Sequence, residues 1–252
     1  MGEPLYVYGV VLAPWRGAIS APGVDGSGVG SVEHAGLVAL ISPLQGEELA
    51  AARGLRAHWR VLQEAFEQAT VVPVRFGTAM ESEDAVRERL LEPGSPQLTD
   101  LLRRLAGLVQ LNLKGRYDEE ALLREVVRDS RVIATLRERV RSLPQGAAQP
   151  ERMRLGELVA GEVARRRERD TMLALRTLEP LAVDTRSEPT TDTRAAFDLA
   201  FLLEGRDRDR FDQEVGRLKQ AMRDRVDIGY IGPLPPYSFA ETDLSHEAAA
   251  WA

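Results

Sequence analysis

The order of apolar segments along the chain predicts an α+β fold in two domains. From residue 108 onward the order is strand, helices, strand, strand, helix, strand, which is the βαββαβ order of a ferredoxin-like split βαβ unit. Because several helices stand between its first two strands, this C-terminal domain carries a helical insertion. The earlier part of the chain reads strand, hairpin, helix, strand and helix, which predicts a smaller, modified α+β sheet domain.

The predicted domains are residues 1–106, an N-terminal α+β domain, and residues 107–252, the ferredoxin-like domain with a C-terminal tail. The chain of 252 residues is long enough to bury a sizeable core. An alternative boundary is the loop Pro144–Pro150, the strongest local break in the sequence. Composition does not decide between the two boundaries.

The N-terminal domain should begin with an apolar strand and a long loop. Leu5–Leu12 is apolar on both faces, which predicts a central strand. Pro14–Ser31 is rich in glycine but lacks the lysine of a phosphate-binding loop, and no helix pattern follows it. We therefore expect a mobile loop there, followed by a hairpin formed by Val32 and Leu37–Ile41.

A helix over Glu47–Thr70 should come next. A stripe at helical spacing predicts its buried face: Leu49, Leu55, Trp59, Leu62 and Phe66. Val71–Phe76 then predicts a strand, and since Pro73 cannot donate to a ladder, that strand is at an edge or has a bulge. Ser82 can cap a further helix, which Pro93 should end.

Periodicity also places the elements of the C-terminal domain. Strands are expected at Leu108–Lys114, Leu181–Thr185, Phe197–Leu203 and Val226–Ile231. Helices are expected from Asp118 onward and at Glu151–Leu178 and Phe211–Met222. The apolar face of the helix Phe211–Met222 should pack on the strand Phe197–Leu203. The run Arg165–Asp170 should form a solvated, ion-paired face, because acids of the same helix offset its arginines.

Composition and motifs argue against several classes of function. The net charge of −6 argues against nucleic acid as the main partner. No run of about 18 apolar residues and no signal-peptide pattern is present, so we expect a cytoplasmic protein with no membrane partner. There is no cysteine, and the three histidines form no metal-binding set: His34, His58 and His246. Without a recognisable hydrolase, kinase or dinucleotide motif, we predict no catalytic residue, metal or cofactor.

The last predicted strand is followed by Gly232-Pro-Leu-Pro-Pro-Tyr-Ser-Phe239, here called the proline-aromatic segment. Its three prolines remove backbone donors and favour an extended ribbon, on which Tyr237 and Phe239 would share a side. The aromatic side chains either plug the core or form an interaction surface, and the sequence leaves both open. In Arg75-Phe-Gly-Thr78, Arg75 contacts an anion or partner, or it satisfies loop carbonyls or a carboxylate, which we favour.

These two segments resemble a known family. Ile231–Phe239 and Val72–Thr78 resemble motifs of the gas vesicle protein GvpF/GvpL family, and weaker matches follow the family's order over nearly the whole chain. The weaker matches are Tyr6–Gly9, Leu178–Ala182 and Ala195–Leu203. Leu234, where the family often has an aromatic, and Ala240, where a larger aliphatic is usual, depart from the pattern. The resemblance implies these signature and possible partner-binding residues: Pro73, Arg75, Phe76, Gly77, Gly232, Pro233, Pro235, Pro236, Tyr237, Ser238 and Phe239.

The resemblance implies a non-enzymatic accessory or minor structural protein that is needed for building gas vesicles and is found in the cytoplasm and at the vesicle. The expected partners are the hydrophobic major shell protein, GvpA, which it would bind before or during polymerisation, and other gas vesicle accessory proteins. The alternative is a ferredoxin-like module that binds a small molecule or acts as an enzyme, because such folds host many unrelated functions.

Overall fold

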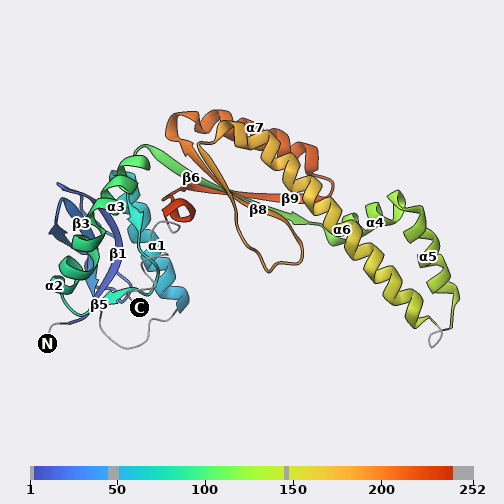
Figure 1. Cartoon of the computed structure of the whole chain (residues 1–252), viewed down its shortest axis with the longest axis horizontal. Coiled ribbons are helices and arrows are strands. Elements are labelled where there is room, and N and C mark those ends of the chain that lie inside the picture. Colours follow the sequence, from blue (N-terminus) through green and yellow to red (C-terminus); the bar gives the residue numbers. More distant parts are fainter. Residues whose placement is uncertain (1–2, 45–50, 145–147, 241–252) are drawn as a thin grey trace. The chain divides into compact units, whose positions relative to one another are not determined.

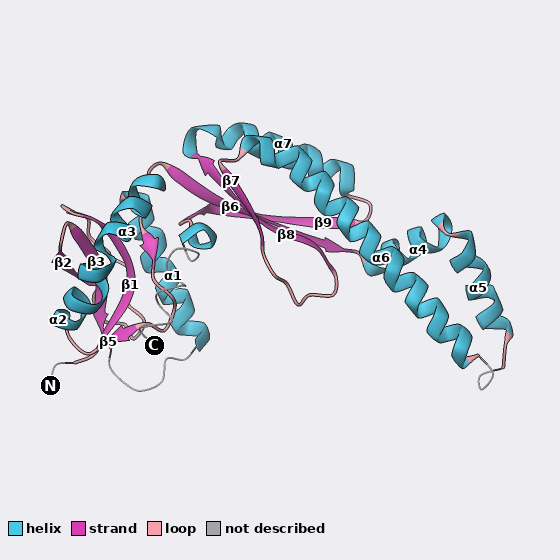
Figure 2. Ribbon diagram, in the orientation of Figure 1, coloured by secondary structure: helices cyan, strands magenta, loops and turns pink. Residues whose placement is uncertain are grey.

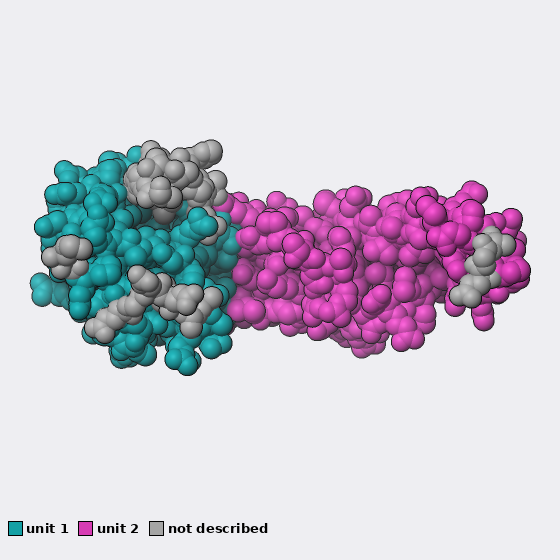
Figure 3. Space-filling model, turned by 90° about the horizontal axis from the view of Figure 1, so that it is seen from below, with its two compact units in different colours: residues 1–110, 232–252 teal, residues 111–231 magenta. Residues whose placement is uncertain are grey.

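The structure is a computed structural model that describes residues 3–44, 51–144 and 148–240. The chain divides into two compact units, residues 1–110 with 232–252, and residues 111–231 (Figure 3). The second unit is thus an insertion in the first, and the proline-aromatic segment is grouped with the N-terminal core rather than with the C-terminal domain. The predicted tail beyond residue 240, Leu49 and residues 145–147 of the loop Pro144–Pro150 lie outside the described residues.

The first unit contains an antiparallel sheet in the order β2-β3-β1-β4, with β5 also pairing with β1 (Figure 1). Its strands are β1 (Leu5–Leu12), β2 (Gly30–His34), β3 (Leu37–Pro43), β4 (Val72–Pro73) and β5 (Ala79–Met80). As predicted, β1 is central and buried on both faces, and β4 with Pro73 is at an edge. Gly9 lies opposite Pro73, where an added Cβ would come within 2.9 Å of the Val72 carbonyl oxygen.

Helix α1 (Ala51–Gln68) packs on this sheet with a different face from the predicted one. Leu62 is buried and Phe66 half-buried, as expected, but Leu55 is 51% and Trp59 40% exposed. The buried face instead consists of Gly54, His58, Val61, Leu62 and Ala65. Small residues allow close approach to the sheet, and His58 finds hydrogen-bond partners there, so tertiary packing overrides the pattern of large apolar side chains.

A second helical stretch continues further than predicted. It comprises α2 (Glu83–Val86), a π-helical turn η1 (Arg87–Leu91) and α3 (Glu92–Arg104). Ser82 caps its start, with Oγ accepting from the Ala85 N–H at 3.1 Å. The prediction that Pro93 ends the helix is wrong, because the π-helical turn shifts the hydrogen-bond register and leaves Pro93 in the first turn of α3. The N–H groups of a first turn have no partner in the helix, so proline is tolerated there.

The glycine-rich loop is packed, not free as predicted. The Glu64 carboxylate of α1 accepts hydrogen bonds from the backbone N–H groups of Ser20 and Ala21, at 2.7 and 2.9 Å. Gln68 exchanges two hydrogen bonds with the backbone of Ala18. Val24 is buried in the core and its N–H donates to the Tyr8 hydroxyl. A single carboxylate therefore fixes part of the loop, which sequence composition does not indicate.

The second unit consists of a four-stranded sheet, in the order β7-β8-β6-β9, and six helical segments (Figure 2). The strands are β6 (Leu108–Tyr117), β7 (Asp184–Ser187), β8 (Ala195–Glu204) and β9 (Val226–Leu234). The helices are α4 (Glu119–Asp129), α5 (Arg131–Ser142), α6 (Gln149–Leu178) and α7 (Arg208–Met222), with short turns η2 (Glu179–Leu181) and η3 (Gly205–Asp207). The molecule is thus a mixed α/β fold with two antiparallel sheets.

Helices α6 and α7 lie on the same face of this sheet (Figure 1). The predicted apolar face of α7 is confirmed as buried: Phe211, Val215, Leu218 and Met222. Phe211 meets Phe201 of β8 edge to face, with ring centroids 5.1 Å apart, and stacks on Tyr230 of β9. Helices α4 and α5 stand between β6 and α6 in the chain, which is where the insertion was predicted.

Replacing Glu64 by alanine should destabilise the first unit, because three donors of the loop lose their shared acceptor. We expect the free energy of unfolding to fall by about 1–2 kcal/mol, as for hydrogen bonds to a charged group. Glu67→Ala, at an exposed position one turn away on the same helix, is the matched control and should change stability by less than about 0.5 kcal/mol. Denaturant unfolding measures both, and equal stabilities of the two variants would contradict the anchoring role.

Candidate functional site

The proline-aromatic segment is a strand end followed by a helical turn, so the predicted extended ribbon is wrong for its second half. Strand β9 continues to Leu234, through a cis peptide bond between Gly232 and Pro233. Residues 237–240 are helical, with the Ala240 N–H donating to the Pro236 carbonyl at 3.0 Å. Prolines at the start of a helical turn lose no helical hydrogen bond, which explains how this sequence can turn.

Helical geometry also separates the two aromatic side chains that the ribbon would have placed together. Residues two apart in a helix differ by about 200° in direction. Phe239 is buried, whereas Tyr237 is half-buried and packs against the core cluster of the first unit. The segment therefore plugs the N-terminal core, which is the first of the two roles that the sequence left open.

A chain of hydrogen bonds that includes His58 joins four distant parts of the sequence. The Gly77 N–H donates to the Tyr6 hydroxyl at 3.0 Å, and that hydroxyl lies 2.9 Å from His58 Nδ1. The other ring nitrogen, Nε2, lies 3.0 Å from the Tyr237 hydroxyl. Since a neutral imidazole carries one proton, one tyrosine donates to the ring and the other accepts from it.

Aromatic rings enclose this histidine. The Tyr6 and Tyr8 rings are each centred 5.6 Å from the His58 ring, and Phe76 meets it edge to face at 5.7 Å. The Tyr8 hydroxyl is itself 2.8 Å from Ser42 Oγ. We call Tyr6, Tyr8, His58, Phe76 and Tyr237 the aromatic cluster.

A second pair of hydrogen bonds fastens the same segment. The side-chain amide of Gln110 donates through Nε2 to Ser238 Oγ at 3.0 Å, and its Oε1 accepts from the Ser238 N–H at 2.9 Å. Gln110 is buried, so both polar ends of its amide have partners inside the first unit. Two separate polar contacts, at Tyr237 and Ser238, thus hold the C-terminal segment on the N-terminal core.

Burial controls the charge states in the aromatic cluster. His58 is 1% exposed, and burial lowers the pKa of its imidazole to about 4. Burial likewise raises the pKa of the Tyr6 hydroxyl to about 12. His58 and Tyr6 are therefore neutral at physiological pH, and both nitrogens of His58 are bonded to tyrosines. The cluster is therefore suited to fastening the fold rather than to proton transfer with a substrate.

The structure brings three of the predicted signature residues together. Phe76, Gly77 and Tyr237 meet at the aromatic cluster, with Gly77 in the left-handed region at φ +92°, which suits glycine. The buried or half-buried remainder of the segment includes Pro235 and Pro236. Tyr6 was named from the sequence only within a weaker family match, and Gln110 was not named; two tyrosines at alternate positions of a buried strand were the available indication.

Arg75 is the exception among the signature residues. Its side chain is exposed and makes no ion pair or hydrogen bond with any residue in the described part of the chain. Only its backbone carbonyl is engaged, by the N–H and Oγ1 of Thr78. The favoured expectation, that the guanidinium satisfies a loop carbonyl or carboxylate, therefore finds no support in these contacts.

The second unit contains a separate, buried charge network. The Asp170 carboxylate of α6 accepts hydrogen bonds from the Tyr117 hydroxyl at 2.7 Å and from Arg225 Nε at 3.3 Å. The Nη2 atom of Arg225 also donates to this carboxylate. Burial, followed by the bond to Asp170, raises the pKa of Tyr117. The carboxylate has an arginine partner and a phenol partner, so its negative charge is compensated inside the unit.

Arg166, one turn earlier, extends this network to α4. Its guanidinium lies 2.8 Å from Asp129 and 3.3 Å from Glu125. Arg166 is 9% and Asp170 5% exposed, so the expectation of a fully solvated face over Arg165–Asp170 is wrong at these two positions. The reason is tertiary: α4 covers this side of α6 and supplies the carboxylates, which periodicity within α6 does not reveal.

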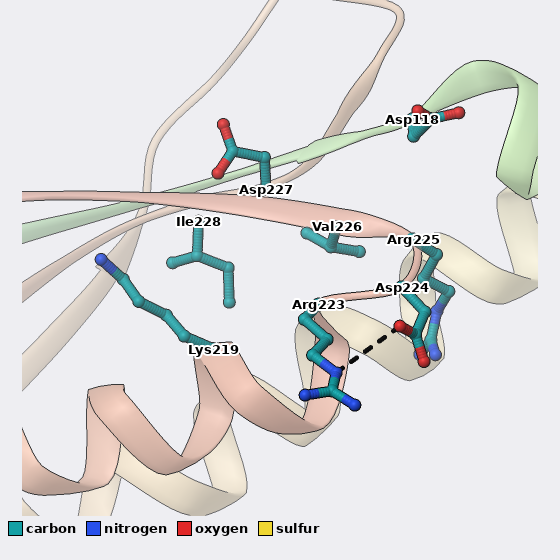
Figure 4. Close-up of a pocket in the computed structure, with 8 residues that line it drawn as sticks. All are labelled: Asp118, Lys219, Arg223, Asp224, Arg225, Val226, Asp227 and Ile228. Carbon is teal, nitrogen blue, oxygen red and sulfur yellow. Dashed lines mark ion pairs between the residues drawn. The ribbon is translucent and has the colours of Figure 1, made fainter.

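An open pocket lies between the end of α7 and the start of β9 (Figure 4). It is lined by Asp118, Lys219, Arg223, Asp224, Arg225, Val226, Asp227 and Ile228. Acidic and basic side chains occur in equal number, and Arg223 pairs with Asp224 at 3.6 Å. Such a lining favours neither an anion nor a cation, so the pocket does not define a ligand class.

The described residues contain neither a metal-binding group nor a membrane-spanning helix. No group of three or more histidine, aspartate or glutamate side chains among them could hold a metal ion, and the sequence has no cysteine. None of the helices in the described ranges is long and apolar enough to cross a membrane.

A comparison with family models decides what kind of protein carries this arrangement. The model of the gas vesicle synthesis protein GvpL/GvpF matches residues 4–241. The chain belongs to this family. The match spans the four segments that meet at the aromatic cluster, and the GvpL/GvpF resemblance seen in the sequence is thereby confirmed.

Curated relatives in the GvpL/GvpF family cover most of the chain. Gas vesicle protein F of a Streptomyces species is 35% identical over 205 residues, which is 81% of this chain and 84% of the relative. Gas vesicle protein F of a Nostoc species is 27% identical over 245 residues, or 96% of this chain and 99% of the relative.

Two solved structures of GvpF proteins are also similar to this chain. The crystal structure of GvpF from Anabaena sp. matches 95% of this chain and 96% of its own, with a TM-score of 0.80 and 27% identity. GvpF from Microcystis aeruginosa matches 94% of this chain and 99% of its own, with a TM-score of 0.78 and 25% identity. The mixed α/β arrangement of this chain is thus that of known GvpF structures.

The buried His58 should make stability depend on pH. Its pKa is about 4 in the folded protein against an ordinary 6.5, so between these values the unfolded chain binds more protons. The contribution of neutral His58 to the free energy of unfolding is fully present above about pH 6.5. It falls by up to about 3 kcal/mol as the pH decreases toward 4. Denaturant unfolding of the wild type and His58→Gln should therefore show curves that converge on acidification.

The matched control for this prediction is His34→Gln, at a half-buried position at the end of β2. This change should leave the acid-dependent decline of wild-type stability in place. If His58→Gln and the wild type instead lose stability in parallel between pH 7 and pH 4, the histidine is not buried in neutral form.

Truncating the two aromatic residues of the proline-aromatic segment should unfold the first unit more readily. Phe239→Ala should cost about 3 kcal/mol, as for other buried phenylalanines. Tyr237→Phe should cost about 1 kcal/mol, because one nitrogen of His58 loses its partner. Circular dichroism melts would show a graded loss, and wild-type melting temperatures for both variants would rule out the core-plug role.

Proposed function

We propose that this protein is a non-enzymatic accessory or minor structural protein for gas vesicle assembly, and that it binds the hydrophobic major shell protein, GvpA, before or during polymerisation. The observation that carries the proposal is the match of the GvpL/GvpF family model over residues 4–241. Agreement with GvpF crystal structures over at least 94% of the chain supports it.

A physical argument supports the binding role. A small, very hydrophobic shell subunit exposes apolar patches and strand edges before it polymerises, and such surfaces aggregate. A folded protein that covers them by strand addition or helix docking would keep the subunit competent for assembly. Such a chaperone-like partner needs a stable scaffold, and the aromatic cluster and the Asp170 network supply two fastened cores.

For the signature residues the proposal separates two roles. The residues that are buried or half-buried, or that bond to the aromatic cluster, hold the fold: Pro73, Phe76, Gly77, Gly232, Pro233, Pro235, Pro236, Tyr237, Ser238 and Phe239. Arg75 is assigned to partner contact, since its exposed guanidinium has no partner among the described residues.

The same proposal includes the architecture. We assign the second unit to the ferredoxin-like class, with α4 and α5 as an insertion in its first crossover. Its strand order, β7-β8-β6-β9, and the placement of α6 and α7 on one face support this assignment. Division of the chain near residue 110, with residues 232–240 returned to the first unit, replaces the simpler division at 106 as the proposed domain boundary.

Other gas vesicle accessory proteins are further proposed partners, and the cytoplasm and the growing vesicle are the proposed locations. Membership of the GvpL/GvpF family and the relatives named gas vesicle protein F support these proposals. No observation on the described residues favours the alternative, a small-molecule-binding or enzymatic module.

The test is expression of a gas vesicle gene cluster with and without this chain. We expect no gas vesicles without it, and we expect the affinity-tagged protein to capture the shell protein from cells that are blocked before vesicle formation. A metabolite thermal-shift screen with the purified protein serves as the comparison and should give no stabilising ligand. Normal vesicles without the chain, together with no capture, would refute the proposal.

A further inference from the structure

The outward side of α1 carries an exposed apolar ridge. Leu55 is 51% and Trp59 40% exposed, and these two residues stand one helical turn apart. Residues at i and i+4 lie on the same side of a helix, so the two side chains form one contiguous strip. The ridge is not the face through which α1 packs on the sheet, because that face is made of other residues, including His58, Val61, Leu62 and Ala65.

Three arginines run beside this ridge. Arg53, Arg56 and Arg60 follow one another at spacings of three and four residues, and all are exposed. None of their guanidinium groups makes an ion pair or hydrogen bond with any residue in the ranges 3–44, 51–144 and 148–240. Like charges at such spacings repel each other by a few tenths of a kcal/mol, so the stripe brings no evident benefit to the helix itself.

Two other arginines of the first unit are paired with acids of the same unit. Arg87 pairs with Glu83 and Asp84, and Arg89 pairs with Glu81. On α1 the nearest acid of the last turns, Glu64, is engaged by the loop backbone at Ser20 and Ala21. The guanidinium groups of the arginine stripe are therefore available to pair with acidic groups outside the described chain.

The composition of this surface favours a protein partner over a lipid surface. Tryptophan and arginine are the residue types most enriched where binding energy concentrates in protein interfaces. A helix that inserts into lipid needs its whole apolar face, but that face of α1 is packed on the sheet. The net charge of −6 also opposes approach to an anionic membrane.

We propose that the ridge Leu55–Trp59 and the stripe Arg53–Arg56–Arg60 form a docking surface for an acidic, amphipathic helix of the assembly partner. The arginines span about 10 Å along α1, which is two helical turns. A partner helix with apolar residues one turn apart and carboxylates alongside them matches both features at once. The proposal deepens the assembly function and rests on it for the identity of the partner as a gas vesicle protein.

The direct test uses two synthetic helical peptides with the same leucine ridge, one flanked by glutamates and the other by lysines. Fluorescence anisotropy of the labelled peptides measures binding to the full-length protein. The glutamate peptide should bind the wild type, and the combined Arg53→Glu, Arg56→Glu and Arg60→Glu variant should bind it about 30-fold more weakly or worse. The lysine peptide should bind the charge-reversal variant more tightly than the wild type. Such a gain of binding requires a folded variant, so it excludes unfolding as the cause of the weaker binding of the glutamate peptide.

Two further variants complete the comparison. Leu55→Ala with Trp59→Ala should weaken binding of the glutamate peptide by about tenfold or more. The matched control is Arg131→Glu, Arg137→Glu and Arg141→Glu, which makes the same change in net charge on exposed positions of α5. That control should change binding by less than about threefold, since a general effect of net charge is screened at physiological salt.

Several outcomes would overturn the inference. Equal binding of the two peptides to the wild type, or an equal loss of binding in the α5 control, would show that no acid-specific surface exists on α1. If the wild type instead binds vesicles of phosphatidylcholine and phosphatidylserine through these arginines and ignores both peptides, the surface is a membrane contact.

Capture of the shell protein separates this inference from the proposed function. If the wild type captures it and the α1 charge-reversal variant does not, both stand. If both capture it equally, the function stands and docking on α1 is wrong. If the wild type fails to capture it, the assembly function fails, and the peptide experiment alone decides whether the α1 surface recognises acidic helices.

Discussion

The fold of the first unit depends on keeping one imidazole neutral inside an aromatic core. His58 would destabilise the core if either of its nitrogens lacked a partner, because a buried polar group without a hydrogen bond costs about 1–3 kcal/mol. Tyr6 from the first strand and Tyr237 from near the end of the chain satisfy both nitrogens. The position of the proline-aromatic segment and the rotation of α1 about its axis both follow from this requirement.

In the second unit the buried polar groups that need partners are charged. Asp170 and Arg166 are buried on α6. Asp129 of α4 and Arg225, just before β9, supply the opposite charges, and Tyr117 of β6 supplies a phenol. Such a network adds less to stability than its many contacts suggest, since desolvation offsets most of the attraction. It is directional, however, so it specifies how the inserted helices sit on their own sheet. The two units thus use neutral and charged polar groups for the same purpose, to select one arrangement among several apolar ones.

Periodicity predicted the elements well, because it reports which residues alternate between core and water within one segment. The central strand β1, the edge position of Pro73 and the buried face of α7 all follow from it. The errors arose where a partner from elsewhere in the chain decides the outcome. Glu64 fixes a loop that composition marks as free, α4 buries Arg166, and His58 turns the Leu55–Trp59 ridge outward. The family motifs located the candidate site, but not the histidine at which they meet.

The insertion of the second unit into the first has a consequence for biosynthesis. The ribosome releases residues 1–110 early, but the residues from 232 onward that complete the same unit emerge only after the whole insertion. At ordinary elongation rates this delay is roughly ten seconds. Until then the site for Phe239 and Tyr237 on the N-terminal core stands open. A nascent or truncated chain therefore exposes an incomplete core, and only a chain that extends through Phe239 can close it.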